Sequence, residues 1–285
     1  QYSLKSSLDF VDLVHGCRNK GICASLDVES LFTNVPVQET ISIICRYVYN
    51  HSTLPPPRIP EELLKQILTI CTSESPFRHP NNNLYLQVDG VAMGSPLGPT
   101  FANYYMGNLE ATVMLNFNPK PLLYARYVDD IFLLVENESD LFKLSDNFEE
   151  KSVLHFTVDL NHQNKQQVHF LDTLITSTES GLKTKVYIKP TNNGVCLNGD
   201  SECPDRYKAS VINSYLLRAY RFSENWMEFN IEVERIKKVL INNNFSNTVV
   251  DNAINSFVTK MVTKESSTQK GKEDNIKLIT LFYRN

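Results

Sequence analysis

Residues 122–127 (LLYARY) and 131–135 (IFLLV) are two apolar stretches with only three residues between them. Each stretch has the length of a strand, and so short a connection predicts a β-hairpin. The connecting residues are Val128, Asp129 and Asp130, so two carboxylates lie at the tip, beside strands that disfavour charge. Because adjacent carboxylates repel each other, a divalent cation would stabilise them. Taken alone, however, the hairpin favours an ordinary solvated turn, because Asp is common in turns.

Asp27 changes the interpretation of this hairpin. Residues 22–26 (ICASL) are apolar and predict a buried strand that ends at Asp27. A strand beside the hairpin would bring three carboxylates together. Such groups hold two metal ions, roughly 3.5–4 Å apart, that stabilise the attacking and leaving oxygens of a phosphoryl transfer. Carboxylate oxygens favour hard cations, so the sequence predicts two Mg²⁺ ions, with Mn²⁺ as a substitute, held by Asp27, Asp129 and Asp130.

The rest of the chain predicts an α+β fold in which strands and helices are mixed at first and give way to helices only. Alternating apolar residues predict strands at 84–88, 154–160, 169–175 and 183–189, with a turn at Ser180 and Gly181 between the last two. Helical spacing predicts helices over residues 37–49, 60–71, 100–115, 139–149, 207–221, 224–241 and 247–261. The change from strands to helices places a domain boundary between residues 190 and 205.

Composition favours a folded, intracellular protein. Hydrophobic residues make up 42% and charged residues 21% of the 285 residues, which excludes a disordered chain. No apolar run approaches the roughly 20 residues that span a bilayer, so no membrane partner is expected. The first residues lack a signal-peptide pattern. The six cysteines form no C-x-x-C pair, which fits a reducing compartment.

The net charge of −4 is unevenly distributed along the chain. Residues 1–182 contain 12 Lys and Arg against 21 Asp and Glu, a balance of −9, whereas residues 183–285 contain 16 against 11, a balance of +5. An acidic first part and a basic second part fit a metal site followed by a phosphate-binding surface. Two ordinary solvated surfaces explain the charges equally well.

Three segments together resemble a known family of polymerases. SLDVESLFTNVP (25–36), GVAMGSPLGPTFANYYMGNLE (90–110) and RYVDDIFLL (126–134) resemble motifs A, B and C of reverse transcriptases in order and approximate spacing. The residues of these motifs are most similar to those of Penelope-like retroelements, whose reverse transcriptases resemble telomerase. The resemblance implies a right-hand polymerase palm, an antiparallel sheet with packed helices, in residues 1–195. It implies an all-helical thumb in residues 196–285.

The resemblance also implies an activity, RNA-directed DNA polymerisation, with an RNA template, a DNA primer, dNTPs and two Mg²⁺ ions. It implies Asp27, Asp129 and Asp130 as catalytic metal ligands, assisted by the carbonyl of Val28. Phe32 falls at the position of an aromatic steric gate, where a bulky ring would collide with a ribose 2′-hydroxyl. Without the motif, Phe32 would be interpreted as a core aromatic.

Further residues match positions near the nucleotide, the primer or the template. Gly94, Ser95 and Pro96 match the turn before the motif B helix, where glycine lets the backbone approach the templating base pair. The implied primer and template contacts are Tyr127, Phe170, Leu171, Lys185, Lys189, Lys208, Arg218 and Arg221. A buried hairpin explains Phe170 and Leu171 equally well. Some of the Lys and Arg side chains in this set must simply face water. Lys165, in a polar turn, is the candidate general acid for pyrophosphate, with an ordinary solvated lysine as its alternative.

The sequence departs from the family pattern in several places. Met93 replaces the glutamine of many reverse transcriptases, although Met is usual in the Penelope-like group, and Lys208-Ala209 replaces a frequent Lys-Arg pair. The fingers motifs and a GIY-YIG endonuclease are expected as further parts of a longer, nuclear protein. Two alternatives remain: a non-catalytic nucleic-acid-binding remnant of a retroelement, and an RNA-dependent RNA polymerase. Phe32 and the Tyr-Val-Asp-Asp wording argue against the latter.

Overall fold

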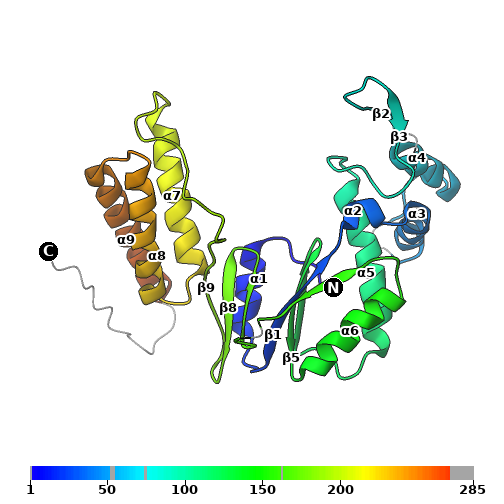
Figure 1. Ribbon diagram of the computed structural model, residues 1–285, viewed down its shortest axis with the longest axis horizontal. Coiled ribbons are helices and arrows are strands. Elements are labelled where there is room, and N and C mark those ends of the chain that lie inside the picture. Colours follow the sequence, from blue (N-terminus) through cyan, green and yellow to red (C-terminus); the bar gives the residue numbers. More distant parts are fainter. Residues whose placement is uncertain (1, 52–54, 74–75, 162, 270–285) are drawn as a thin grey trace. The chain divides into compact units, whose positions relative to one another are not determined.

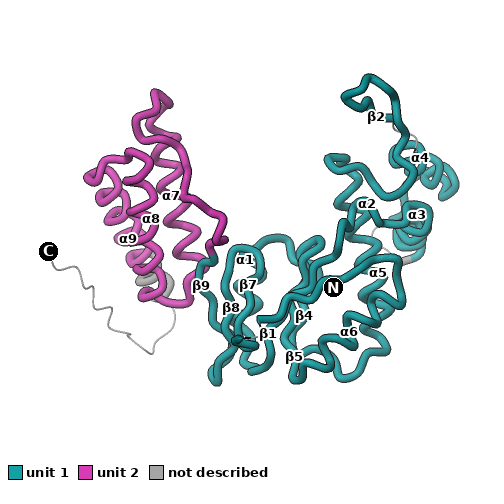
Figure 2. The backbone as a smooth tube through the Cα atoms, viewed as in Figure 1, with its two compact units in different colours: residues 1–187 teal, residues 188–285 magenta. Residues whose placement is uncertain are grey.

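The computed structural model describes residues 2–51, 55–73, 76–161 and 163–269. The chain divides into two compact units, Gln1–Tyr187 and Ile188–Asn285 (Figures 1 and 2). The first unit combines antiparallel sheets with helices, and the second has helices, joined by loops, and no strand among its described residues. The predicted α+β fold, with a palm-like antiparallel sheet followed by helices, is therefore confirmed. No helix in the described ranges is long and apolar enough to cross a membrane.

A four-stranded antiparallel sheet forms the centre of the first unit. Its order is β4-β5-β1-β6, so β1 lies between two partners. The strands are β1 (Ile22–Val28), β4 (Leu123–Tyr127), β5 (Asp130–Val135) and β6 (Phe156–Asp159). Cys23, Ala24 and Leu26 are all fully buried, which is the pattern of a strand covered on both faces. This burial explains why the apolar run in β1 occupies the middle of the sheet.

Each face of the central sheet has its own hydrophobic core. Ala24 and Leu26 of β1, with Ile131 of β5, pack on the face that α5 (Gly98–Asn116) and α6 (Glu138–Glu150) cover (Figure 1). A third helix, α3 (Val37–Arg46), packs against α5 and adds residues to the same core. Cys23 and Phe132 point to the opposite face, where α1 (Ser7–Gly16) and a second sheet cover them. Successive residues of β1 therefore alternate between the two cores, as they do in any regular strand.

The second sheet corrects one prediction. Residues 169–175 were expected to form one strand, but they are divided between β7 (Gln167–Phe170) and β8 (Thr173–Thr178). β7 pairs with β8, and β8 pairs on its other side with β9 (Gly181–Val186). Leu171 turns the chain with a φ of 52°, and the Thr173 hydroxyl donates to the Phe170 carbonyl at 2.9 Å. Phe170 and Ile175 are five residues apart, so one continuous strand would place them on opposite faces. The turn lets both enter the same core.

Smaller elements follow β1 and α3. They are α2 (Leu31–Asn34), the π-helical turn η1 (Tyr47–His51), α4 (Glu61–Ser73), β2 (Pro76–Arg78) and β3 (Leu84–Leu86). The predicted helix 37–49 therefore ends as an α-helix at Arg46 and continues in the wider η1 turn. The predicted strand at 84–88 is shorter and pairs with β2, which the sequence pattern did not predict, because neither strand is buried.

The described part of the second unit contains three helices, each close to a predicted range. They are α7 (Asp205–Phe222), α8 (Trp226–Asn242) and α9 (Asn247–Gln269). Leu216, Ile236 and Val250, one from each helix, are fully buried in a shared core. The Asn225 side chain caps α8 by accepting a hydrogen bond from the Glu228 N–H at 3.0 Å. Since each helix buries one apolar stripe, this unit has a core of its own.

Candidate active site

The tip of the β4-β5 hairpin is a turn of two residues, not three. Tyr127 and Asp130 are the last pair of the ladder, so only Val128 and Asp129 lie between the strands. Asp130 thus belongs to β5 instead of the tip. Val128 has a φ of 56°, which is costly for a β-branched residue. Two-residue hairpin turns require positive φ, and here that requirement falls on a residue that resists it.

Asp27 lies beside this turn, within β1 and not after its end. It is the register partner of Asp130 on β5 and of Thr157 on β6. Residues opposite each other in an antiparallel sheet project from the same face. Tyr127, Asp130, Asp27 and Thr157 therefore form one row across the four strands. Two of the three predicted carboxylates are direct neighbours in that row, and Asp129 occupies the adjoining turn.

Negative charge accumulates around Asp27. Desolvation raises the pKa of Asp27 above its ordinary value, and the charges of Asp129 and Glu29 raise it further. The Glu29 carboxylate accepts a hydrogen bond from the Thr157 hydroxyl at 2.7 Å, at the end of the same row. The Val28 N–H donates to the Asp129 carbonyl at 3.2 Å and so ties the turn to β1. A cation at this place would offset both the desolvation of Asp27 and the repulsion by Asp129 and Glu29.

The aspartates fit a divalent cation by their chemistry. The three candidate ligands are all carboxylates, whose oxygens Mg²⁺ and Mn²⁺ prefer. Across the residues that the structure describes, no three His, Cys, Asp or Glu side chains converge closely enough to hold a metal ion. The strand pairing thus brings Asp27, Asp129 and Asp130 into neighbouring positions without closing them around an ion.

Phe32 and the segment before α5 are joined by backbone contacts. The Val91 N–H donates to the Phe32 carbonyl at 2.7 Å. The Phe32 ring is partly buried against the core that contains Ala24 and Leu26. Gly90, with a φ of 65°, packs so closely that an added Cβ would lie 2.4 Å from the Thr33 carbonyl. Only glycine combines this φ with this approach. The pairing fixes the position of Phe32 relative to the loop that leads into α5.

Gly94, Ser95 and Pro96 form the turn that precedes α5. Gly94 has a φ of 90° and lies in open space. The Ser95 N–H donates to the Ala92 carbonyl at 3.1 Å, and the Ser95 hydroxyl accepts from the Leu97 N–H at 3.3 Å. Gly94 and Pro96 are exposed, so this turn is accessible from solvent.

Three residues predicted near the primer lie in different environments. Tyr127 is partly buried in the row of carboxylates, and Leu171 is half-buried in the β7-β8 turn. Phe170 is only 2% exposed, and its ring lies 4.5 Å from that of Phe10, centroid to centroid. Its side chain is therefore part of the core, which was the alternative interpretation of this hairpin.

Lys165, the predicted general acid, lies near the opposite end of β1 from the aspartates. Its carbonyl accepts from the Cys23 N–H at 3.0 Å, at the opposite end of β1 from Asp27. Four residues of strand correspond to about 13 Å. Its ammonium pairs with the Glu138 carboxylate in the first turn of α6. In this arrangement the Lys165 ammonium is paired with Glu138 and not with the row of aspartates.

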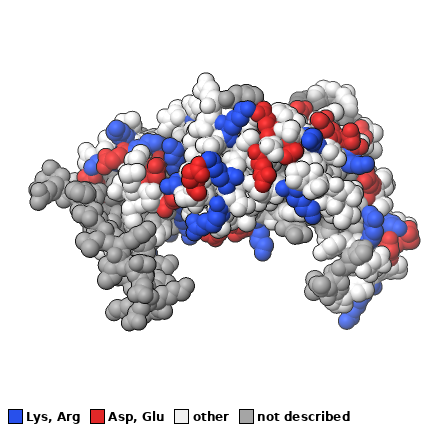
Figure 3. All heavy atoms as spheres, turned by 90° about the horizontal axis from the view of Figure 1, so that it is seen from below, with Lys and Arg blue, Asp and Glu red and all other residues white. Residues whose placement is uncertain are grey.

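The predicted phosphate-binding cations are spread over both units. Lys185 is exposed on β9 of the first unit, whereas the others belong to the second unit and, apart from Lys189, lie on α7. Arg221 and Lys189 are exposed, Lys208 is half-buried, and the Arg218 guanidinium lies 5.9 Å from the centroid of the Phe222 ring. On the face that Figure 3 shows, basic and acidic side chains are interspersed.

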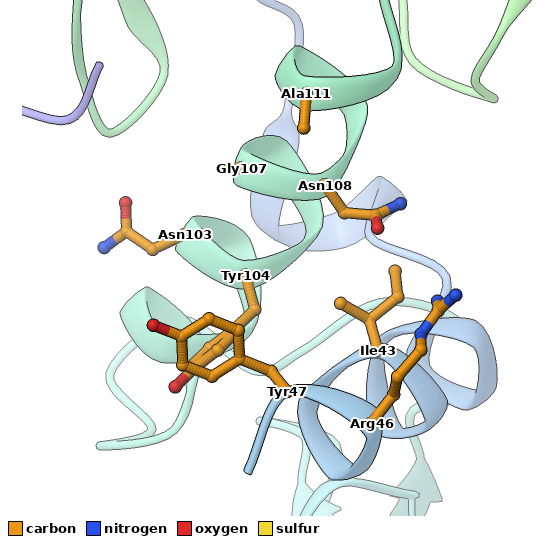
Figure 4. A pocket seen from close by; sticks show the side chains of 8 residues that line it. All are labelled: Ile43, Arg46, Tyr47, Asn103, Tyr104, Gly107, Asn108 and Ala111. Carbon is orange, nitrogen blue, oxygen red and sulfur yellow. The ribbon is translucent and has the colours of Figure 1, made fainter. Parts of the chain in front are cut away.

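Sequence reasoning missed a buried ion pair beside the site and a cavity elsewhere in the first unit. Arg126 and Glu110 form a buried ion pair behind the hairpin turn, with Nε and Oε1 2.6 Å apart. A charged residue inside the apolar run LLYARY was the available signal, since a buried charge requires a partner. The second feature is a cavity of about 460 Å³ between α3 and α5, shown in Figure 4 and lined by Ile43, Arg46, Tyr47, Asn103, Tyr104, Gly107, Asn108 and Ala111.

Two family models match the chain. Residues 2–177 match the model described as reverse transcriptase (RNA-dependent DNA polymerase), and residues 195–255 match the model of an animal helix-turn-helix domain. A search of curated proteins gave no significant match.

Solved telomerase structures resemble this fold. Apo telomerase from Candida tropicalis matches 92% of this chain and 48% of its own, with 10% identity and a TM-score of 0.53. Telomerase from Candida albicans, in complex with a TWJ fragment of telomeric RNA, matches 88% of this chain and 55% of its own, with 11% identity and a TM-score of 0.51. The chain spans about half the length of these structures. At such identities the likeness concerns the fold alone.

Proposed function

This chain belongs to the reverse transcriptase (RNA-dependent DNA polymerase) family, and from that membership we propose that it copies an RNA template into DNA. The primer 3′-hydroxyl oxygen forms a bond to the α-phosphorus of a dNTP. The bond from that phosphorus to the bridging oxygen of the β-phosphate breaks, pyrophosphate leaves, and the hydroxyl proton passes to solvent. The observation that carries the proposal is the row of Asp130 and Asp27 beside the Asp129 turn.

The three aspartates would hold two Mg²⁺ ions, or Mn²⁺ in their place, with the carbonyl of Val28 as a further ligand. When bound, these ions supply charge stabilisation at the attacking and leaving oxygens. The chain's own contribution is to keep the carboxylates on the rigid centre of the sheet, where β1 is covered on both faces. Tyr127, in the same row, is suited to support the primer end.

Phe32 and the turn at Gly94 are suited to select and position the nucleotide. The partly buried ring of Phe32 would exclude a ribose 2′-hydroxyl. The hydrogen bond from the Val91 N–H to the Phe32 carbonyl holds the backbone of Phe32 in place. The open space at Gly94 leaves its backbone free to approach a base pair. Together these residues would favour dNTPs over ribonucleotides.

The helical second unit would act as a thumb that binds the template-primer duplex. Its match to a helix-turn-helix model supports a role in nucleic-acid binding. Exposed cations such as Lys189 and Arg221 would contact phosphates, which gives affinity without reading sequence. The finer assignment, to a Penelope-like retroelement acting in the nucleus, rests on the wording of the three motifs.

A non-catalytic nucleic-acid-binding remnant is the second candidate. The helix-turn-helix match favours it, because binding alone would explain the second unit. It leaves the row of Asp27 and Asp130, with the raised pKa of Asp27, without a role. Mg²⁺-dependent nucleotide binding separates the two candidates.

The test is calorimetric titration of the chain with dATP, with and without Mg²⁺, followed by primer extension on an RNA template. We expect binding only with Mg²⁺, loss of binding in Asp129→Asn, and unchanged binding in the matched control Asp146→Asn, an exposed position on α6. Incorporation of ribonucleotides as readily as dNTPs would identify an RNA polymerase instead. Absence of both Mg²⁺-dependent binding and extension would leave the non-catalytic remnant.

A further inference from the structure

A buried charge pair lies directly behind the hairpin turn. The side chains of Arg126 on β4 and Glu110 on α5 are 1% and 2% exposed, and their Nε and Oε1 atoms are 2.6 Å apart. The Tyr124 hydroxyl donates to the same Oε1 at 3.0 Å. Removing two charges from water is costly, and an apolar pair of similar volume is often as stable or more so. Stability alone is therefore a weak reason for this pair.

Arg126 makes two further contacts that point to another role. Its Nη1 donates to the carbonyl of Val128 at 2.9 Å and to Oδ1 of Asn103 at 3.0 Å. Val128 is the residue with the unfavourable φ of 56°, and it immediately precedes Asp129. A guanidinium presents several donors in a fixed plane, so one side chain can hold the turn, Glu110 and Asn103 together.

The turn is thus anchored on both of its residues. Arg126 binds the Val128 carbonyl from the helical side of the sheet, and the Val28 N–H binds the Asp129 carbonyl from β1. Asn103 fixes the guanidinium from α5. Figure 4 shows the Asn103 amide pointing away from Arg46 and Asn108, the polar groups at the other end of the cavity. Its partner Arg126 is not among the residues that line this cavity.

We propose that Arg126 is a positioning residue: held by Glu110 and Asn103, it fixes the strained Val128 turn and thereby the carboxylate of Asp129. This inference rests on the proposed polymerase function, because it assigns the pair a role in the geometry of that site. Arg126 touches no reacting atom and acts through the backbone. Misplacement of a reacting group by about 1 Å costs about 100-fold in rate, so a modest shift of the turn has a large effect.

The experiment separates positioning from stability. Arg126→Met alone leaves Glu110 buried and unpaired, which lowers the melting temperature by roughly 10 °C. In the double variant Arg126→Met/Glu110→Met, both charges are gone, so we expect the melting temperature to recover most of this loss and to stay a few degrees below the wild type, because the Tyr124 hydroxyl loses its acceptor. We expect kcat for primer extension to stay about 100-fold low, with little change in KM for the dNTP. Hydrogen exchange at the Val28 amide, which bonds the turn, should be faster than in the wild type.

A second variant covers the case in which the double variant does not fold. Asn103→Ala removes one anchor of the guanidinium and should lower kcat about tenfold while lowering the melting temperature by only a few degrees, because one Nη1 contact of the buried guanidinium is lost. Asn108→Ala, on the same helix and without a contact to Arg126, is the matched control. Wild-type kcat and Val28 exchange in Asn103→Ala, or in a folded double variant, would overturn the inference. Measuring hydrogen exchange at the Val28 amide requires no enzymatic activity. It therefore tests positioning even if the wild type neither binds dATP nor extends a primer. Such a lack of binding and extension would refute only the proposed function.

Discussion

Asp27 and Asp130 lie directly opposite each other on the neighbouring strands β1 and β5. Side chains in such a pair share one face of the sheet and lie about 5 Å apart at their Cβ atoms. Like charges in that arrangement destabilise a sheet, and desolvation raises the pKa of Asp27 in addition. The opposed carboxylates therefore carry a cost in stability, as shifted charges at functional sites commonly do.

Asp27→Asn should separate stability from activity. The amide has nearly the same shape and removes the repulsion by Asp129 and Glu29, so the melting temperature without divalent ions should stay the same or rise. Loss of a metal ligand should lower primer extension about a thousandfold. Thermal unfolding and single-turnover extension measure the two effects. A variant that loses stability and activity together would indicate a structural role for Asp27.

Gly90→Ala should be destabilising beyond an ordinary glycine substitution. Its φ of 65° and the 2.4 Å approach to the Thr33 carbonyl oppose any Cβ, so we expect a loss of about 2 kcal/mol or more in the free energy of unfolding. Gly107→Ala, in the middle of α5 with open space around it, is the control and should gain about 0.5–1 kcal/mol. Urea unfolding measures both. Equal effects at the two sites would show that Gly90 is not held against Thr33.

Cys23 should be unreactive in the folded protein. Burial raises the pKa of this thiol from 9.0 to about 12, and only the thiolate is nucleophilic. The pKa of Cys23 is higher in the folded than in the unfolded protein. The contribution of its neutral thiol to the free energy of unfolding is therefore fully present below about pH 9 and is lost as the pH rises towards 12. Iodoacetamide labelling at pH 8, read by mass spectrometry, should modify the exposed Cys71 and not Cys23. Rapid labelling of Cys23 would mean that β1 opens readily.

Lys208 and Arg221 on α7 should contribute to nucleic-acid binding through charge alone. Replacing both by Gln should weaken binding to every template-primer sequence equally. The dependence of log K on log salt should become shallower by about one unit for each phosphate that the variant no longer neutralises. Lys120→Gln, an exposed position before β4, is the control. An unchanged salt slope in the double variant, measured by fluorescence anisotropy, would exclude these two residues from the binding surface.

Sequence patterns predicted the central hairpin, the strand before Asp27 and the helices from α3 onward, because each is strongly apolar or has a strong apolar period, but they did not predict α1 or the short α2. They failed where tertiary contacts decide the local structure. The break at Leu171 depends on bringing Phe170 and Ile175 into one core, and no local period records that requirement. Spacing alone also could not place Lys165. Its position follows from the hydrogen bond between its carbonyl and the N–H of Cys23, more than 100 residues earlier in the chain.

Lys165 provides the sharpest test of that placement. If it were the general acid for pyrophosphate, Lys165→Ala would lower kcat by about 10²–10⁴-fold and abolish a pH-dependent step. The structure instead holds its ammonium at Glu138 and its backbone at the far end of β1 from Asp27. We therefore expect unchanged kcat and an unchanged pH profile of primer extension in Lys165→Ala. The partner variant Glu138→Gln should behave in the same way, since a partly exposed ion pair contributes only about 0–1 kcal/mol. A large loss of kcat in Lys165→Ala, but not in Glu138→Gln, would restore the catalytic role and require the turn around Lys165 to move towards the aspartates during the reaction.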